Sequence, residues 1–64
     1  MMEEIRRVVN IVKRRVRNEP RVELGVLVFD TLTDSGFDPS AEMFGSAFKM
    51  VKDTAHKEMN YADR

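Results

Sequence analysis

A group of basic side chains near the start of the sequence is its strongest chemical signal. Guanidinium and ammonium groups along one side of a helix are suited to neutralising phosphates, and arginine adds a planar fork of donors. The pattern therefore predicts contacts with an acidic protein surface or with nucleic-acid phosphates. The simpler alternative is a solvated face, or one that pairs with acidic side chains of the middle segment or of another subunit. The group consists of Arg6, Arg7, Lys13, Arg14 and Arg17.

Other features argue against a dedicated nucleic-acid binder. No aromatic side chain lies on the basic face, so bases would have nothing to stack on. The chain as a whole carries eleven Lys plus Arg and eleven Asp plus Glu, a formal net charge of 0. A helix-turn-helix around Gly36 is disfavoured, because phosphates would repel Asp38 and Glu42 at the start of the reading helix. Binding to a protein partner is therefore the first hypothesis, and association with nucleic acid is the alternative.

The candidates for catalysis or metal binding are weaker. The 64 residues include no Cys and one His, which excludes thiolate chemistry and a multi-histidine metal site within one chain. His56 and Asp53 would share a helix face, which is more typical of a surface histidine than of a metal ligand. An EF-hand spacing is present, with hydroxyl groups where Ca²⁺ needs carboxylates, at Thr31, Thr33, Ser35, Gly36 and Glu42. We therefore expect no enzyme activity, no cofactor and no metal.

The basic group requires a helix to align it, and the spacing predicts one over residues 2–18. At about 100° per residue, the apolar side chains of this segment fall within an arc of about 100°, opposite most of the basic ones. These apolar side chains are Ile5, Val8, Val9, Val12 and Val16. Because β-branched residues lower intrinsic helicity, this helix needs a partner surface.

The middle of the chain is ambiguous between helix and strand. The composition of residues 22–29 favours a strand, which would make the fold α+β. A helix over 20–35 is predicted instead, because it would align Glu19, Glu23, Asp30 and Asp34 within an arc of about 60°. Pro20 fits the first turn of such a helix, and Gly36 fits the left-handed position after its end. Its apolar residues cover most of the circumference, so it must be buried on several sides.

A third helix is predicted over residues 39–58, followed by a frayed tail at residues 60–64. Asp38 would be its N-cap and Pro39 its first residue. Its apolar stripe is more typical of a core, but an exposed subset would suit a partner. The side chains that we expect at such an interface are Met43, Phe44, Phe48 and Met50.

Three helices with short connections predict one small all-α bundle. A core from so short a chain barely offsets the entropy of ordering it, so we expect a second copy to complete the bundle as a homodimer. The longest apolar run is too short to cross a bilayer, and the start of the chain lacks a secretory signal pattern. The sequence therefore predicts a soluble cytoplasmic interaction protein that does not bind membranes.

Overall fold

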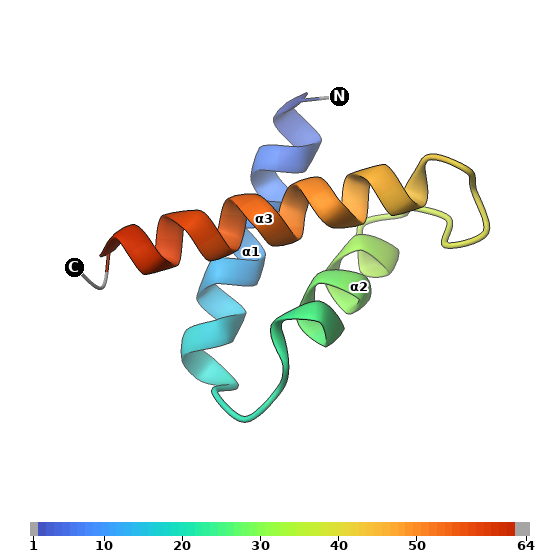
Figure 1. The fold of residues 1–64 in the computed structure, drawn as a ribbon. Helices are drawn as coiled ribbons and strands as arrows, with labels where there is room; N and C mark the ends of the chain where they lie inside the picture. Colours follow the sequence, from blue (N-terminus) through green and yellow to red (C-terminus); the bar gives the residue numbers. More distant parts are fainter. Residues whose placement is uncertain (1, 63–64) are drawn as a thin grey trace.

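Residues 2–62 form an all-helical fold of three helices. The computed structural model describes the backbone of residues 2–62 and the side chains of residues 2–59. The helices are α1 (Met2–Asn18), α2 (Leu24–Asp34) and α3 (Phe44–Ala62), and each contacts the other two. Figure 1 shows α1 and α2 as the arms of a V, with α3 lying across both. No strand occurs within residues 2–62, so the α+β alternative with a strand over residues 22–29 is wrong.

Helix α1 has the bounds that its apolar spacing predicts. Its apolar stripe is buried at Ile5, Val8, Val9 and Val12, which lie between the other two helices. The first turn carries Glu3 and Glu4, and the last turn carries basic side chains, so both ends suit the helix dipole. The partner surface that these β-branched residues need is therefore supplied by α2 and α3.

Helix α2 begins four residues later than predicted, at Leu24 instead of residue 20. Pro20 lies in a turn, in which the Val22 backbone N–H donates to the Glu19 carbonyl at 3.1 Å. Glu19 is held to the end of α1 by its backbone bond to the Arg15 carbonyl and by the Arg15 side chain. Glu19 therefore belongs to the α1 corner, and the predicted alignment of four carboxylates on one helix is wrong.

The end of α2 follows the sequence prediction. Gly36 has a φ of 96°, in the left-handed region that glycine adopts without a steric penalty. The Phe37 N–H donates to the Leu32 carbonyl and the Gly36 N–H to the Thr33 carbonyl, the bond pair of a Schellman motif. The Phe37 side chain then packs against the core. Gly36 therefore turns the chain sharply toward α3.

Helix α3 begins at Phe44, five residues later than predicted. The Asp38 carboxylate does accept bonds from the Ser40 N–H and hydroxyl, at 2.9 and 2.8 Å, but it caps only a single turn. Residues 38–43 are all exposed, so no buried side chain stabilises further helix there. At the other end, residues 60–62 continue the helix where a frayed tail was predicted. Residues 63 and 64 lie outside the described residues.

The core is built from all three helices. Leu27, Val28 and Leu32 of α2 are fully buried. Helix α3 contributes Val51 and Ala55, also fully buried, and Phe44, which meets the Phe29 ring edge to face at a centroid distance of 5.4 Å. None of the helices within the described residues is long and apolar enough to cross a membrane.

We predict opposite effects of one substitution at two glycines. A Cβ at Gly36 or at Gly45 meets no atom within 4 Å, so the backbone conformation alone decides the effect. Gly36→Ala should lower the free energy of unfolding by about 1 to 2 kcal/mol, because alanine is strained at positive φ. Gly45→Ala, inside α3, should raise it by up to about 1 kcal/mol. Urea unfolding followed by circular dichroism measures both, and equal effects would contradict the assigned left-handed corner.

Candidate functional site

The five basic side chains predicted as a binding face divide into two sets. Arg6 and Lys13 both bind Glu58 of α3, with Lys13 Nζ at 2.8 Å from Oε1 and Arg6 Nη1 at 3.0 Å from the same oxygen. Arg6 Nη1 also lies 3.0 Å from Glu58 Oε2. These two cations therefore join α1 to α3, which is the pairing within the chain that was the simpler alternative, although its acid comes from α3.

Glu58 is electrostatically matched to this position. The hydrogen bond from Lys13 lowers the pKa of its carboxyl below the ordinary value of 4.5, and the hydrogen bond from Arg6 adds to the effect. The carboxylate therefore stays ionised to a lower pH than that of an unpaired glutamate. Because all three side chains are partly exposed, solvent screens the pair and its contribution to stability is modest.

The second set consists of Arg7, Arg14 and Arg17, which we call the arginine stripe. All three are exposed, and none makes an ion pair with a residue whose side chain the structure describes. At about 100° per residue they lie within an arc of about 80° on the side of α1 that faces away from the core. These three guanidinium groups are the part of the predicted basic face that is left to bind another molecule.

Arg15 was not among the predicted site residues, yet it makes the most side-chain hydrogen bonds of the charged residues for which such bonds are described. Its guanidinium donates to Glu19 through Nε at 2.8 Å, to Asp30 Oδ2 at 2.7 Å and to the buried Thr31 hydroxyl at 3.3 Å. The pKa of Arg15 is raised by these bonds, Glu19 first, and Arg15 lowers the pKa of the Glu19 carboxyl. The i, i+4 spacing of Arg15 and Glu19 is the signal that could have identified this pair.

Three of the four apolar interface candidates line a groove at the start of α3. Met43 and Met50 are 68% and 45% exposed, and Met2 of α1 is 70% exposed. Together with the nearly buried Phe44 and with Phe37, they line a cavity of about 250 Å³ whose walls are almost entirely apolar. We call these five residues the methionine groove. Sequence spacing could not include Met2, because α1 and the start of α3 are brought together only by the fold.

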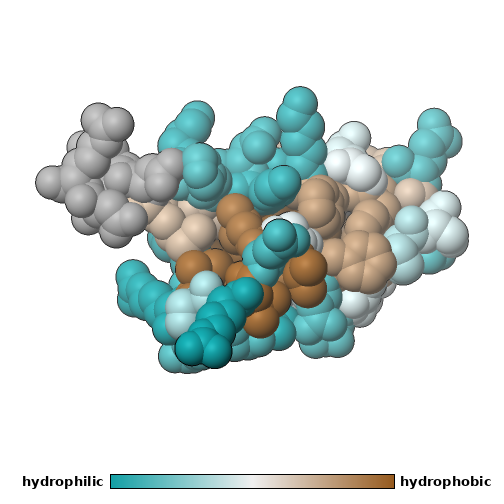
Figure 2. All heavy atoms as spheres, turned by 60° about the horizontal axis from the view of Figure 1, so that its bottom comes forward, coloured by the Kyte–Doolittle hydropathy of each residue, from teal (hydrophilic) through white to brown (hydrophobic). Residues whose placement is uncertain are grey.

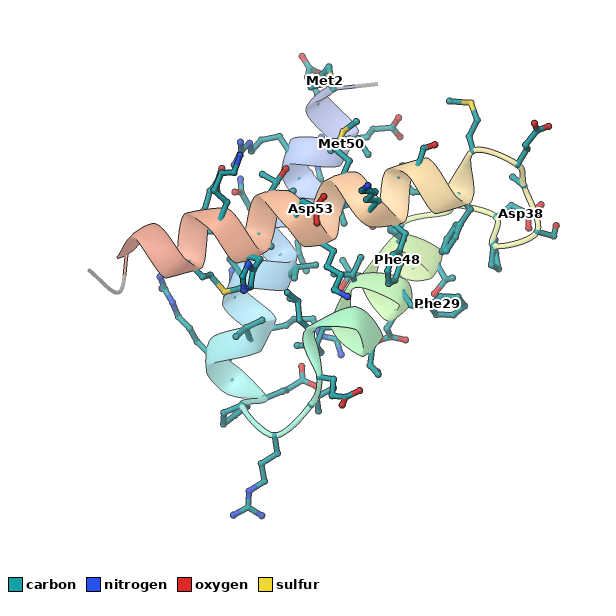
Figure 3. The ribbon with its side chains drawn as sticks, viewed as in Figure 1. Met2, Phe29, Asp38, Phe48, Met50 and Asp53 are labelled. Carbon is teal, nitrogen blue, oxygen red and sulfur yellow. The ribbon has the colours of Figure 1, made fainter. Side chains whose placement is uncertain are left out.

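Phe48, the remaining apolar candidate, lies on a different surface. Figure 3 shows Met2 and Met50 on one side of α3 and Phe48, with Phe29 of α2, on the other. Phe48 lines a shallow, open depression with Val22, Val26 and Phe29, which are 38%, 54% and 47% exposed. The expectation that α2 is buried on several sides is therefore met only on its inner side. The predicted interface residues form two surfaces, with Phe44 between them.

No group of three metal-binding side chains comes together in the part of the chain that the structure describes. The sequence matches no protein-family profile, and it matches no curated protein and no solved structure. The functional conclusion therefore depends on the surfaces described above.

We predict that Lys13 controls the acid titration of Glu58. Lys13→Met should raise the Glu58 pKa toward its ordinary value, and by more than Arg6→Met does, because Lys13 has the larger effect. Since the folded pKa is lowered, the pair stabilises the fold above the ordinary pKa and loses this contribution as the pH falls through the folded pKa. The variant should therefore show a shallower dependence of unfolding free energy on pH in that acid range.

Carbon-13 NMR titration of the Glu58 carboxyl measures the shift directly. Lys57→Met is the matched control, because Lys57 is adjacent in sequence, is exposed and makes no described ion pair. If Lys57→Met moved the Glu58 pKa as far as Lys13→Met, the 2.8 Å contact would not be its cause.

Proposed function

We propose that this protein is a non-catalytic interaction module. It binds a partner protein that inserts an apolar side chain into the methionine groove and carries acidic groups attracted by the arginine stripe. The groove is the observation that supports this most directly. A small protein rarely leaves large apolar side chains clustered in a concave surface unless another molecule covers them.

The methionine groove suits a protein ligand for two reasons. Its cavity of about 250 Å³ is large enough for one leucine or phenylalanine side chain and too small for most cofactors. Methionine side chains are flexible and polarizable, so Met2, Met43 and Met50 can adjust to the shape of an inserted side chain. An apolar anchor in a pocket, surrounded by a polar rim, is the usual arrangement at the centre of a protein interface.

The arginine stripe sets the charge of the partner. Arg7 also lines a smaller hollow of about 140 Å³ with Phe37, which is a residue of the methionine groove, so the stripe begins beside the groove. The other two arginines lie farther along α1, where they raise the rate of encounter with an acidic surface without direct contact. Attraction of this kind is screened by salt over about 8 Å at physiological ionic strength.

Self-association is the second part of the proposal. Among residues 2–59, ten apolar residues are buried, while six large apolar side chains are exposed. A core of that size barely offsets the conformational entropy of the chain. A second copy that covers part of the exposed apolar surface would add the missing burial.

We predict that Met43→Glu abolishes capture of the partner by the immobilised protein from a lysate of its native host. A charge placed in the groove should weaken binding by about a hundredfold, because it is buried without a counterion. Arg14→Glu with Arg17→Glu should instead slow association at low salt and have little effect at high salt. Asp53→Ala, an exposed site on α3 outside both surfaces, is the control. A partner retained equally by all variants would overturn the proposal.

The alternative function is association with nucleic acid through the arginine stripe, whose three guanidinium groups make no ion pair with a described side chain. It predicts retention on a DNA oligonucleotide or on heparin, with a salt dependence that disappears in the double Arg14→Glu and Arg17→Glu variant. With about three phosphate contacts, the affinity should fall only modestly as salt rises. No retention of the wild-type protein at about 0.1 M salt would exclude this alternative and favour a protein partner.

A further inference from the structure

The surface shared by α2 and α3 has a centre of exposed apolar side chains. Val26 and Phe29 lie three residues apart on one face of α2, and Val22, in the turn before the helix, lines the same depression, so the three form a single stripe. Phe48 of α3 borders the stripe, with its ring 3.7 Å from the position a Cβ would take on Gly25. Figure 2 shows apolar side chains across the middle of this face, with hydrophilic ones on both sides. We call these four residues the α2–α3 patch.

The two edges of the patch carry opposite charges. On the α1 side, Glu23 borders the depression just before α2 begins, and Asp30 and Asp34 lie within about 40° of each other on α2. The opposite edge, formed by α3, is basic. Lys52 follows Phe48 by one turn of α3 and therefore lies on the same face of the helix as Phe48, with Lys49 beside it. Among the residues with described side chains, Glu23, Lys49 and Lys52 make no ion pair.

The contacts of two phenylalanine rings indicate where these charged residues lie along the length of the patch. Phe44 meets Phe29, and Phe48 meets Gly25, so α2 and α3 run in opposite directions along the patch. Lys52 lies one turn beyond Phe48 on α3, and Glu23 lies two residues before Gly25 on the other side. Lys52 and Glu23 therefore lie toward the same end of the patch, on opposite edges of one apolar surface.

We propose that the α2–α3 patch is the interface of a symmetric homodimer in which Lys52 of each copy faces Glu23 of the other. A two-fold axis along the groove between α2 and α3 turns one copy face to face onto the other. This rotation leaves each residue at the same position along the axis and exchanges the two edges of the patch, so the lysine edge of one copy meets the acidic edge of the other. A two-fold interface requires one surface that complements itself, and this surface does.

A second copy fits the patch better than an unrelated partner does, because one copy supplies both the apolar surface and both matching charges. Stable interfaces bury about 800 Å² per partner, which is about a sixth of the 4878 Å² surface of this chain. The inference rests on the self-association proposed above and assigns it to a surface separate from the methionine groove. The tests below distinguish the two surfaces.

The first test is the oligomeric state measured by sedimentation equilibrium over a range of concentrations. The wild-type protein should dimerise, and Val26→Glu should raise the dimer dissociation constant by about a hundredfold. Met43→Glu is the matched control, because Met43 is also apolar and exposed but lies in the methionine groove. Circular dichroism confirms that each variant keeps its helices. A dimer that persists in Val26→Glu and dissociates in Met43→Glu would overturn the assignment.

The second test uses exchanged charges. Lys52→Glu alone places two acids opposite each other, and Glu23→Lys alone places two lysines opposite each other, so each variant should dimerise about tenfold more weakly than wild type. A mixture of the two restores both ion pairs, and should form heterodimers about as strongly as wild type dimerises. Isotope-labelled copies of one variant make the heterodimer visible by native mass spectrometry. A mixture that associates no better than its components would overturn the pairing.

The outcomes separate this inference from the proposed function. A wild-type protein that stays monomeric at every concentration overturns the dimer, while capture of a partner through Met43 would still support the interaction module. The second copy is also overturned as the occupant if the wild-type protein is monomeric and its patch binds a different protein whose binding is blocked by Val26→Glu. If dimerisation depends on Val26, the inference is supported. If, in addition, no partner is captured through Met43, the proposed function of the methionine groove is contradicted.

Discussion

Burial of the valine-rich stripe of α1 is the constraint on which the rest of the structure depends. β-Branched residues make α1 a poor helix by itself, so its formation is coupled to its coverage by α2 and α3. Val8, Val9 and Val12 have almost no exposed surface, and both other helices pack on them. The outer side of α1 is therefore free to carry cations, and the outer sides of α2 and α3 carry the apolar surfaces.

Ion pairs at the two sides of α1 determine which of its charges are available. Arg15 joins the end of α1 to Asp30 and Thr31 of α2, and Glu58 of α3 binds two cations on the opposite side. These contacts join α1 to both neighbouring helices. They also engage Arg6, Lys13 and Arg15 in ion pairs, so these cations are not available to another molecule. What remains outside is the arginine stripe. The basic residues of α1 thus serve in two ways: some form ion pairs with the other helices, and the others form the exposed arginine stripe.

Helix α1 could be predicted from the sequence because one strong apolar period spans it, and the corner at Gly36 because few residues other than glycine tolerate its backbone. The starts of α2 and α3 could not. Pro20 and Asp38 are equally compatible with a helix start and with a turn, and only the tertiary contacts of Glu19 and the exposure of residues 38–43 decide between them. The methionine groove was predicted in part, because Met2 joins it only through the packing of α1 on α3.

The position of Glu58 has a consequence for how the charge of this surface can change. A single carboxylate holds two cations of α1, so any event that neutralises it releases both at once. Among the residues with described side chains, the outer surface of α1 would then present five positive groups without an ion pair in place of three. While Glu58 is ionised, its carboxylate engages two of these cations, and the positive potential of the outer surface of α1 comes from Arg7, Arg14 and Arg17.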